Sequence, residues 1–432
     1  MLGTFVQSIV TMTDGIFVSK LGTLEIGAFG NGSLLYLAFF MLCRGLADGA
    51  QITIAKLKGE GLFSKIGETL KATQIFQLII TGFILFTFIL FGNQLIDLFN
   101  ADSPINEPMK DFINVRLWGL VFATQHIVLV GFFIGLGRTS IIMTSALIIA
   151  VCNIFLDYVL INGYIGFPAL GLVGAPLASS ISELIGFLFL LIYLIKNTSY
   201  KVYNYRLNGL GIQLKEHLAL LQLSYPLMLQ GVFALSTWLV FFTKVEGMGP
   251  EALETSHNIR YMYFLAFVPL FGFAASTKTI VSSLVGQKQL HLVPMVQNRI
   301  LILSIGFMVL VFHGALLYPQ LLISLVDLNP LISDKVYSDS VAILQFVSGS
   351  ILIYSIAIVY YNTISGLGKS RIYFGIELIA ILLYLISCQL FIDTWHWNIR
   401  DVWWVEYVYF ITFAVLSIGY FIYYRKKYIT HV

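Results

Sequence analysis

The sequence predicts an all-α membrane protein with about twelve membrane-spanning helices in two six-helix bundles, related by a pseudo-two-fold axis along the membrane normal. Three observations predict this fold class: an apolar composition, a succession of long apolar runs, and an internal repeat. Hydrophobic residues make up 58% of the 432 residues and charged residues only 11%, whereas a soluble domain carries about 25% charged residues. The mean hydropathy of +0.87 agrees with a chain that lies mostly within a bilayer.

The apolar runs follow one another along the whole chain, each near the length of about 20 residues that crosses the hydrocarbon core as a helix. No water is available there for the backbone, so each run is expected to satisfy its own amides as a helix. The predicted helices cover residues 2–18, 24–43, 72–96, 112–134, 140–162, 172–195, 218–243, 252–275, 296–318, 340–364, 370–392 and 403–424.

A segment near the start of the chain returns about 227 residues later, and a second echo follows at an offset of about 231 residues. In the second echo Gly135–Arg138 reappears as Gly366–Lys369. Each half holds an even number of predicted spans, so both halves enter the membrane from the same side and the repeat is parallel. Such repeats are typical of secondary transporters, which handle substrate between the halves. The first echo pairs Gly22, Asn31, Tyr36, Phe40 and Gly45 with Gly249, Asn258, Tyr263, Phe267 and Gly272.

Charged residues predict the orientation. Lysine and arginine gather in alternate loops, which the positive-inside rule places in the cytoplasm. We therefore expect a multi-pass protein of the plasma (inner) membrane with both termini cytoplasmic. The predicted domains are an N-terminal lobe of residues 1–195, a cytoplasmic linker of 196–214 and a C-terminal lobe of 215–432. Because Pro226, near the start of the second repeat, maps just before residue 1, the N-terminal lobe is expected to be truncated at its start.

Intramembrane carboxylates indicate the functional site. Asp14 lies in the first predicted helix and Asp157 in the fifth, and a carboxylate at mid-helix costs about 2.5–3.5 kcal/mol on insertion scales unless something compensates it. Asn153 shares one helix face with Asp157, and Ser179 follows a glycine-rich hairpin. Hard oxygen ligands of this kind suit Na⁺ or a proton. These four residues form a candidate cation-binding site; the alternative is that both aspartates cap helix ends near the outer surface.

Motifs for other kinds of chemistry are missing from the sequence. It has no Walker-type Gly-x-x-x-x-Gly-Lys-Ser/Thr, catalytic triad, metal cluster or nucleotide fingerprint, so we expect neither an enzyme nor a cofactor, and only Na⁺ or H⁺ as coupling ion. The net charge of +3 is spread over loops and predicts no nucleic-acid partner. The three cysteines, Cys43, Cys152 and Cys388, are expected to pack inertly. His126 and His313 are expected to make contacts within the bundle, with proton relay as the alternative.

Two segments resemble a known family. The run Asn153-Ile-Phe-Leu-Asp157, continued through Gly174-Ala175-Pro176 to Ser179, resembles the helix 5–6 hairpin of MATE (multidrug and toxic compound extrusion) transporters, and Asp14–Gly22 resembles their helix 1 signature. The two Gly-Leu-Gly-Arg/Lys turns are also similar. The likeness covers nearly the whole chain.

The resemblance implies a V-shaped pair of six-helix lobes that export organic compounds as Na⁺ or H⁺ enters. The cation site of relatives maps onto Asp14, Asn153, Asp157 and Ser179. Two departures are Pro176 in place of alanine and Ser179 in place of threonine. The helix 7 glutamate of some relatives is absent. The repeat counterparts of Asn153 and Asp157 are Tyr384 and Cys388, so cation chemistry is expected in one half only.

The remaining polar residues predict a substrate cavity. Glu246 is expected to pair with Arg260 as a structural salt bridge, with a substrate contact as the alternative, and Lys244 and Arg260 are taken as the main intramembrane cations. Glu183 and Glu377 are expected to have packing partners. The predicted cavity residues are Gln7, Asn31, Tyr36, Gln230, Asn258, Tyr263, Arg260 and Glu246.

Three function classes remain: an ion-coupled antiporter that exports drugs by rocking of the two lobes, a flippase or exporter of lipid-linked saccharides, and a channel or scaffold. The flippase requires a more cationic cavity for its polyanionic cargo, and the paired acids in one lobe disfavour a channel. The sequence therefore favours the antiporter. Its expected partners are small amphiphilic organic substrates and membrane lipids, and the protein is expected to be a monomer.

Overall fold

The structure, a computed structural model, describes residues 10, 13–100, 103–205, 214–326 and 333–429, and every regular element among them is a helix. Internal contacts divide the chain into two compact units, residues 2–232 and 233–432, with the boundary inside one long helix. Eleven helices in the described ranges are long and apolar enough to span a membrane. The predicted lobe bounds of 1–195 and 215–432 stay a prediction.

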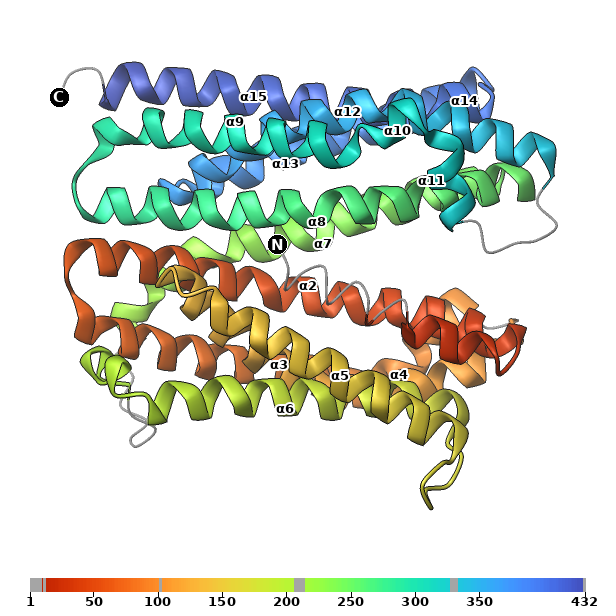
Figure 1. Ribbon diagram of the computed structural model, residues 1–432, viewed down its shortest axis with the longest axis horizontal. Helices are drawn as coiled ribbons and strands as arrows, with labels where there is room; N and C mark the ends of the chain where they lie inside the picture. The colour runs from red at the N-terminus through yellow and green to blue at the C-terminus, as the bar shows by residue number, and fades with distance from the viewer. Residues whose placement is uncertain (1–9, 11–12, 101–102, 206–213, 327–332, 430–432) are drawn as a thin grey trace. The chain divides into compact units, whose positions relative to one another are not determined.

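The N-terminal unit is built around one central helix. Residues 13–19 are helical and precede α2. In this unit α4 packs against α2, α3 and α6, while α5 packs mainly against α6; Figure 1 shows these helices as long, roughly aligned ribbons. The elements are α2 (Thr23–Glu60), α3 (Phe63–Asn100), α4 (Asn106–Gly135), α5 (Ser140–Asn162), η1 (Gly171–Val173), α6 (Gly174–Lys196), η2 (Thr198–Tyr203) and the first part of α7 (Leu214–Glu246).

The C-terminal unit repeats this packing. Here α12 takes the central place and contacts α8, α9 and α15, and α13 packs on α15. The order of partners is the same as for α4, so the sequence repeat is also a repeat of helix packing. The elements are the rest of α7, α8 (Pro250–Gly286), η3 (Leu290–Leu292), α9 (Val293–Phe312), α10 (Gly314–Leu317), α11 (Pro319–Val326), α12 (Asp334–Gly366), α13 (Ser370–Cys388), η4 (Gln389–Thr394), α14 (Ile399–Val402) and α15 (Trp404–Tyr428).

Most helices extend past the predicted spans. Hydropathy detects only the part of a helix that lies in hydrocarbon, whereas α2 continues through a polar segment and ends at Glu60, with Gly61 in the left-handed region (φ 74°). The predicted helix 296–318 is instead interrupted. α9 ends at Phe312, and Pro319 begins the short α11 because proline suits the first turn of a helix and not its interior.

Close helix packing depends on Gly45 in α2. A Cβ at this position would overlap the backbone of Met228 in the first part of α7. We expect Gly45→Ala to destabilise the protein by about 1–3 kcal/mol, because backbone atoms cannot move aside as a side chain can. The measurement is the midpoint of thermal unfolding in detergent. Gly30→Ala is the matched control, since Gly30 is in the same helix with open space at its Cβ; equal midpoints for both variants would contradict the prediction.

Candidate cation site

The four predicted ligands come together inside the N-terminal unit. Ser179 Oγ donates a hydrogen bond to Asp14 Oδ2 at 3.2 Å and accepts one from Asn153 Nδ2 at 3.4 Å. Asp157 lies beside Asp14, and the two carboxylates interact electrostatically. All four side chains are buried, with Asn153 and Asp157 fully inaccessible. Neither aspartate therefore lies at an exposed helix end.

Several oxygens of this cluster have no hydrogen-bond partner. They are Asp14 Oδ1, Asn153 Oδ1, and both carboxylate oxygens of Asp157. A buried polar atom without a partner costs roughly 1–3 kcal/mol, and more when it is charged. Four acceptors around two carboxylates form a pocket of negative charge that a proton or a small cation would satisfy.

The α5–α6 hairpin positions three of these residues. Asn153 and Asp157 are one turn apart on α5, which ends at Asn162 and is followed by Gly163 with φ 77°. A Cβ on Gly174 would lie 2.9 Å from the backbone nitrogen of Ile161, so glycine allows α6 to begin directly against the end of α5. Pro176 fits the first turn of α6, where its missing N–H removes no helical hydrogen bond. This close start brings Ser179, one turn later, to Asn153.

A buried ion pair lies near the site. Arg116 on α4 donates two hydrogen bonds to Glu183 on α6, at 2.8 and 2.7 Å, and its guanidinium stacks 3.8 Å from the ring centroid of Tyr36. Arg116 also interacts electrostatically with Asp14. The expectation that Lys244 and Arg260 are the main intramembrane cations is therefore wrong, because it overlooked Arg116. The expected packing partner of Glu183 is confirmed.

The predicted residues in the C-terminal unit have other contacts. Lys244 pairs with Asp393. Arg260 lies 5.0 Å from the ring centroid of Phe242, and the expected Glu246–Arg260 salt bridge does not form among the described residues. Glu246 is exposed in the last turn of α7, and the guanidinium of Arg260 turns to an aromatic ring instead.

The other cavity residues do not form one cluster within either unit. Asn258 donates to Ser340 Oγ at 3.3 Å, and Tyr263 is fully buried and hydrogen-bonded to Ser350 at 3.1 Å. Asn31 is exposed and Gln230 half-buried. Gln7 lies outside the described residues. The substrate cavity stays a prediction.

The histidines and cysteines form no second site in the described ranges. His126 shares a hydrogen bond of 2.9 Å with Ser145, and His313 contacts a backbone carbonyl. The three cysteines are free thiols. No group of three or more His, Cys, Asp or Glu side chains suited to a metal ion is found across the part of the chain that the structure describes.

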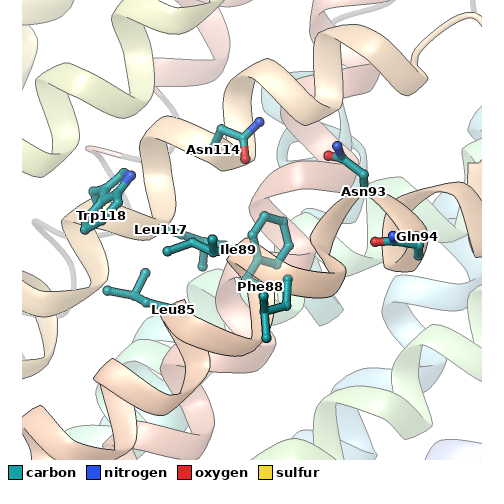
Figure 2. Close-up of a pocket in the computed structure, with 9 residues that line it drawn as sticks. Leu85, Phe88, Ile89, Asn93, Gln94, Asn114, Leu117 and Trp118 are labelled. Carbon is teal, nitrogen blue, oxygen red and sulfur yellow. The ribbon is translucent and has the colours of Figure 1, made fainter.

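A surface hollow between α3 and α4 lies apart from the cation site. Figure 2 shows it lined by Phe88, Ile89, Asn93, Asn114 and Trp118, among others. Ile89 and Trp118 are among the exposed apolar side chains, which suits a surface that faces lipid. None of the four predicted cation ligands lines it.

Comparisons with known proteins agree with this fold. A family model described as MatE matches residues 1–159 and 226–390. A probable multidrug resistance protein NorM of Thermotoga maritima is 26% identical over 326 residues, 75% of this chain and 69% of that protein. Another, of Synechocystis sp., is 26% identical over 393 residues, 87% and 83% of the two chains.

Solved transporter structures have the same fold as this chain. A MOP superfamily transporter from Pyrococcus furiosus superposes with a TM-score of 0.87 at 19% identity, covering 99% of this chain and 93% of that one. A Vibrio cholerae MATE transporter superposes at 0.86 and 16% identity, covering 100% and 96%. The predicted fold class is confirmed.

Proposed function

The chain belongs to the MatE family, and from that premise we propose that it is a secondary active antiporter that exports organic compounds, drugs among them, in exchange for Na⁺ or H⁺. The observation that carries the proposal is the set of unpaired oxygens on Asp14, Asn153 and Asp157. A buried site whose two carboxylates keep three unpaired oxygens is costly to fold. That cost is offset when the site takes up the positive charge that drives transport.

The coupling follows from the position of Asp14. The helical segment that carries it is held to α6 through the hydrogen bond from Ser179. Uptake of Na⁺ or H⁺ between Asp14 and Asp157 removes their mutual repulsion, so the first helix repacks and the two lobes rock from outward-facing to inward-facing. One elementary charge that crosses the membrane field contributes about 2.3 kcal/mol per 100 mV, which is sufficient to bias a two-state equilibrium.

The proposal also covers the membrane location, the oligomeric state and the substrate class. The protein works as a monomer in the plasma (inner) membrane, with both termini cytoplasmic, and takes small amphiphilic compounds from the cytoplasm or the adjoining lipid. The NorM relatives of Thermotoga maritima and Synechocystis sp. are named as probable multidrug resistance proteins, which supports this substrate class. A saccharide flippase is less well supported, because Arg116 and Lys244 are each neutralised by an acid and Arg260 is directed at the ring of Phe242.

The test is accumulation of ethidium in everted vesicles, with the two gradients imposed separately. We expect ethidium to accumulate when the lumen is loaded with Na⁺ or made acidic, because the ion then leaves the lumen as the dye enters. Vesicles without the protein are the control. Accumulation that persists when both gradients are collapsed would refute ion-coupled antiport.

A further inference from the structure

The C-terminal unit holds a buried carboxyl group that the proposed mechanism does not use. Glu406, in the first turn of α15, is 1% exposed. Its Oε1 accepts a hydrogen bond from the hydroxyl of Tyr384 on α13 at 3.2 Å. No lysine, arginine or histidine in the described ranges pairs with it. A carboxylate buried in this way lacks the counter-charge that Arg116 supplies to Glu183.

The groups around Glu406 come from three helices. Tyr263 on α8, Tyr384 and Cys388 on α13, and Tyr409 on α15 all interact with it electrostatically. Each of these is neutral in its ordinary state. The charged groups next to these neighbours are Glu377 on α13, which accepts from Tyr409, and Lys244 and Asp393, which interact with Cys388 and pair with each other. The surroundings are thus phenols and a thiol, with no fixed positive charge.

Two influences on Glu406 oppose each other. Burial among aromatic rings favours the neutral acid. The hydrogen bond from Tyr384 and the N-terminal end of α15 favour the carboxylate, because both direct positive partial charge at it. Trp403 adds a further donor in the same region, since its buried indole N–H has no partner. The site therefore holds partners for both protonation states: apolar rings around the neutral acid, and donors for the carboxylate.

The internal repeat places Glu406 on the helix pair that corresponds to the pair holding the cation cluster. Tyr384 on α13 is the repeat counterpart of Asn153 on α5, and α15 follows α13 as α6 follows α5. In the N-terminal unit the cation cluster spans this same pair of helices, through Asn153 and Ser179. In the C-terminal unit the same pair meets through Tyr384 and Glu406. The carboxylate lies on the second helix of the pair, α15, while the counterpart of Asp157 on α13 is Cys388.

We propose that Glu406 and Tyr384 form a second ion site, a proton site, in the C-terminal unit. The carboxyl group of Glu406 takes a proton from solution to become the neutral acid and returns it to solution to become the carboxylate, while Tyr384 keeps its hydrogen bond to Oε1. The ligand is a proton because one carboxylate and a phenol donor offer too few oxygen acceptors for Na⁺. This proposal does not depend on the exported compound or on the Asp14 site.

The test is pH-difference infrared spectroscopy of the full chain in lipid nanodiscs, which follows the carbonyl stretch of protonated carboxylic acids. We expect a band that disappears as the pH rises and that is missing in Glu406→Gln. Glutamine keeps the shape of the side chain and the acceptor for Tyr384. Glu377→Gln is the matched control, because Glu377 is a buried acid of the same unit that accepts from Tyr361 and Tyr409; it should leave the Glu406 band in place.

A second variant protects the test against a folding defect. Tyr384→Phe retains Glu406 and removes its hydrogen bond, so the same band should remain and change in frequency. Identical titrating bands in the wild type and Glu406→Gln, or a Glu406 band that stays constant across the pH range, would show a purely structural acid and overturn the proposal. The infrared signal does not depend on transport. The Glu406 proposal can therefore be refuted while ion-coupled export is supported, and ion-coupled export can be refuted while the Glu406 proposal is supported.

Discussion

Asp157→Asn abolishes ion-driven accumulation of ethidium while the protein remains folded in the membrane; this is the largest effect that we expect on function. Asparagine has the shape of aspartate but carries no charge, so it neither attracts a cation nor exchanges a proton. Asp157 is fully buried and both of its carboxylate oxygens lack partners. Neutralising it also removes the repulsion from Asp14, so the thermal midpoint should not fall.

The measurement is ethidium accumulation in everted vesicles under an imposed Na⁺ or pH gradient, at matched protein levels. Accumulation by Asp157→Asn should drop to the level of vesicles that lack the protein. Asp111→Asn is the control, because it is the same substitution at an exposed position on α4. Normal gradient-driven accumulation by Asp157→Asn would remove this residue from the coupling site.

The architecture could be predicted because two of its causes are visible in the sequence. Long apolar runs must be helices in a bilayer, and the echo of Gly22 at Gly249 indicated one bundle used twice. Helix ends were less predictable. The end of α2 at Glu60 depends on a left-handed Gly61 beyond the hydrocarbon, which a hydropathy pattern does not register.

The candidate site was predictable to different degrees. Helical spacing alone put Asn153 and Asp157 on one face. That Asp14 and Ser179 join them was inferred from the cost of lone carboxylates inside the membrane and supported by a resemblance, since a contact between different helices, such as the one between Asp14 and Ser179, leaves no periodic signal. Arg116 was missed because a single cation within an apolar run has no visible partner in the sequence, and Glu183 lies two helices away. A search for lone charges of opposite sign in predicted spans would have suggested the pair.

Arg116→Met should cause the largest loss of stability among the substitutions considered, about 3–5 kcal/mol, because it leaves the carboxylate of Glu183 buried without its counter-charge. The two side chains are only 11% exposed and joined by two parallel hydrogen bonds. Stacking of Arg116 on Tyr36 adds a smaller contribution, about 0.5–2 kcal/mol. Most of the lost stability comes from burying the Glu183 carboxylate without a counter-charge, and less comes from losing its hydrogen bonds with Arg116.

The double variant Arg116→Met with Glu183→Met separates these two causes. Removing both charges restores most of the lost stability, since apolar side chains of similar volume replace a buried ion pair at little cost. The measurement is the thermal midpoint in detergent for the wild type, both single variants and the double variant. Lys335→Met is the control, because its partner Glu251 is half exposed and a surface pair contributes roughly 0–1 kcal/mol. A double variant no more stable than Arg116→Met would mean that the guanidinium acts through its packing on Tyr36 and α6, and that the buried charge of Glu183 is tolerated without it.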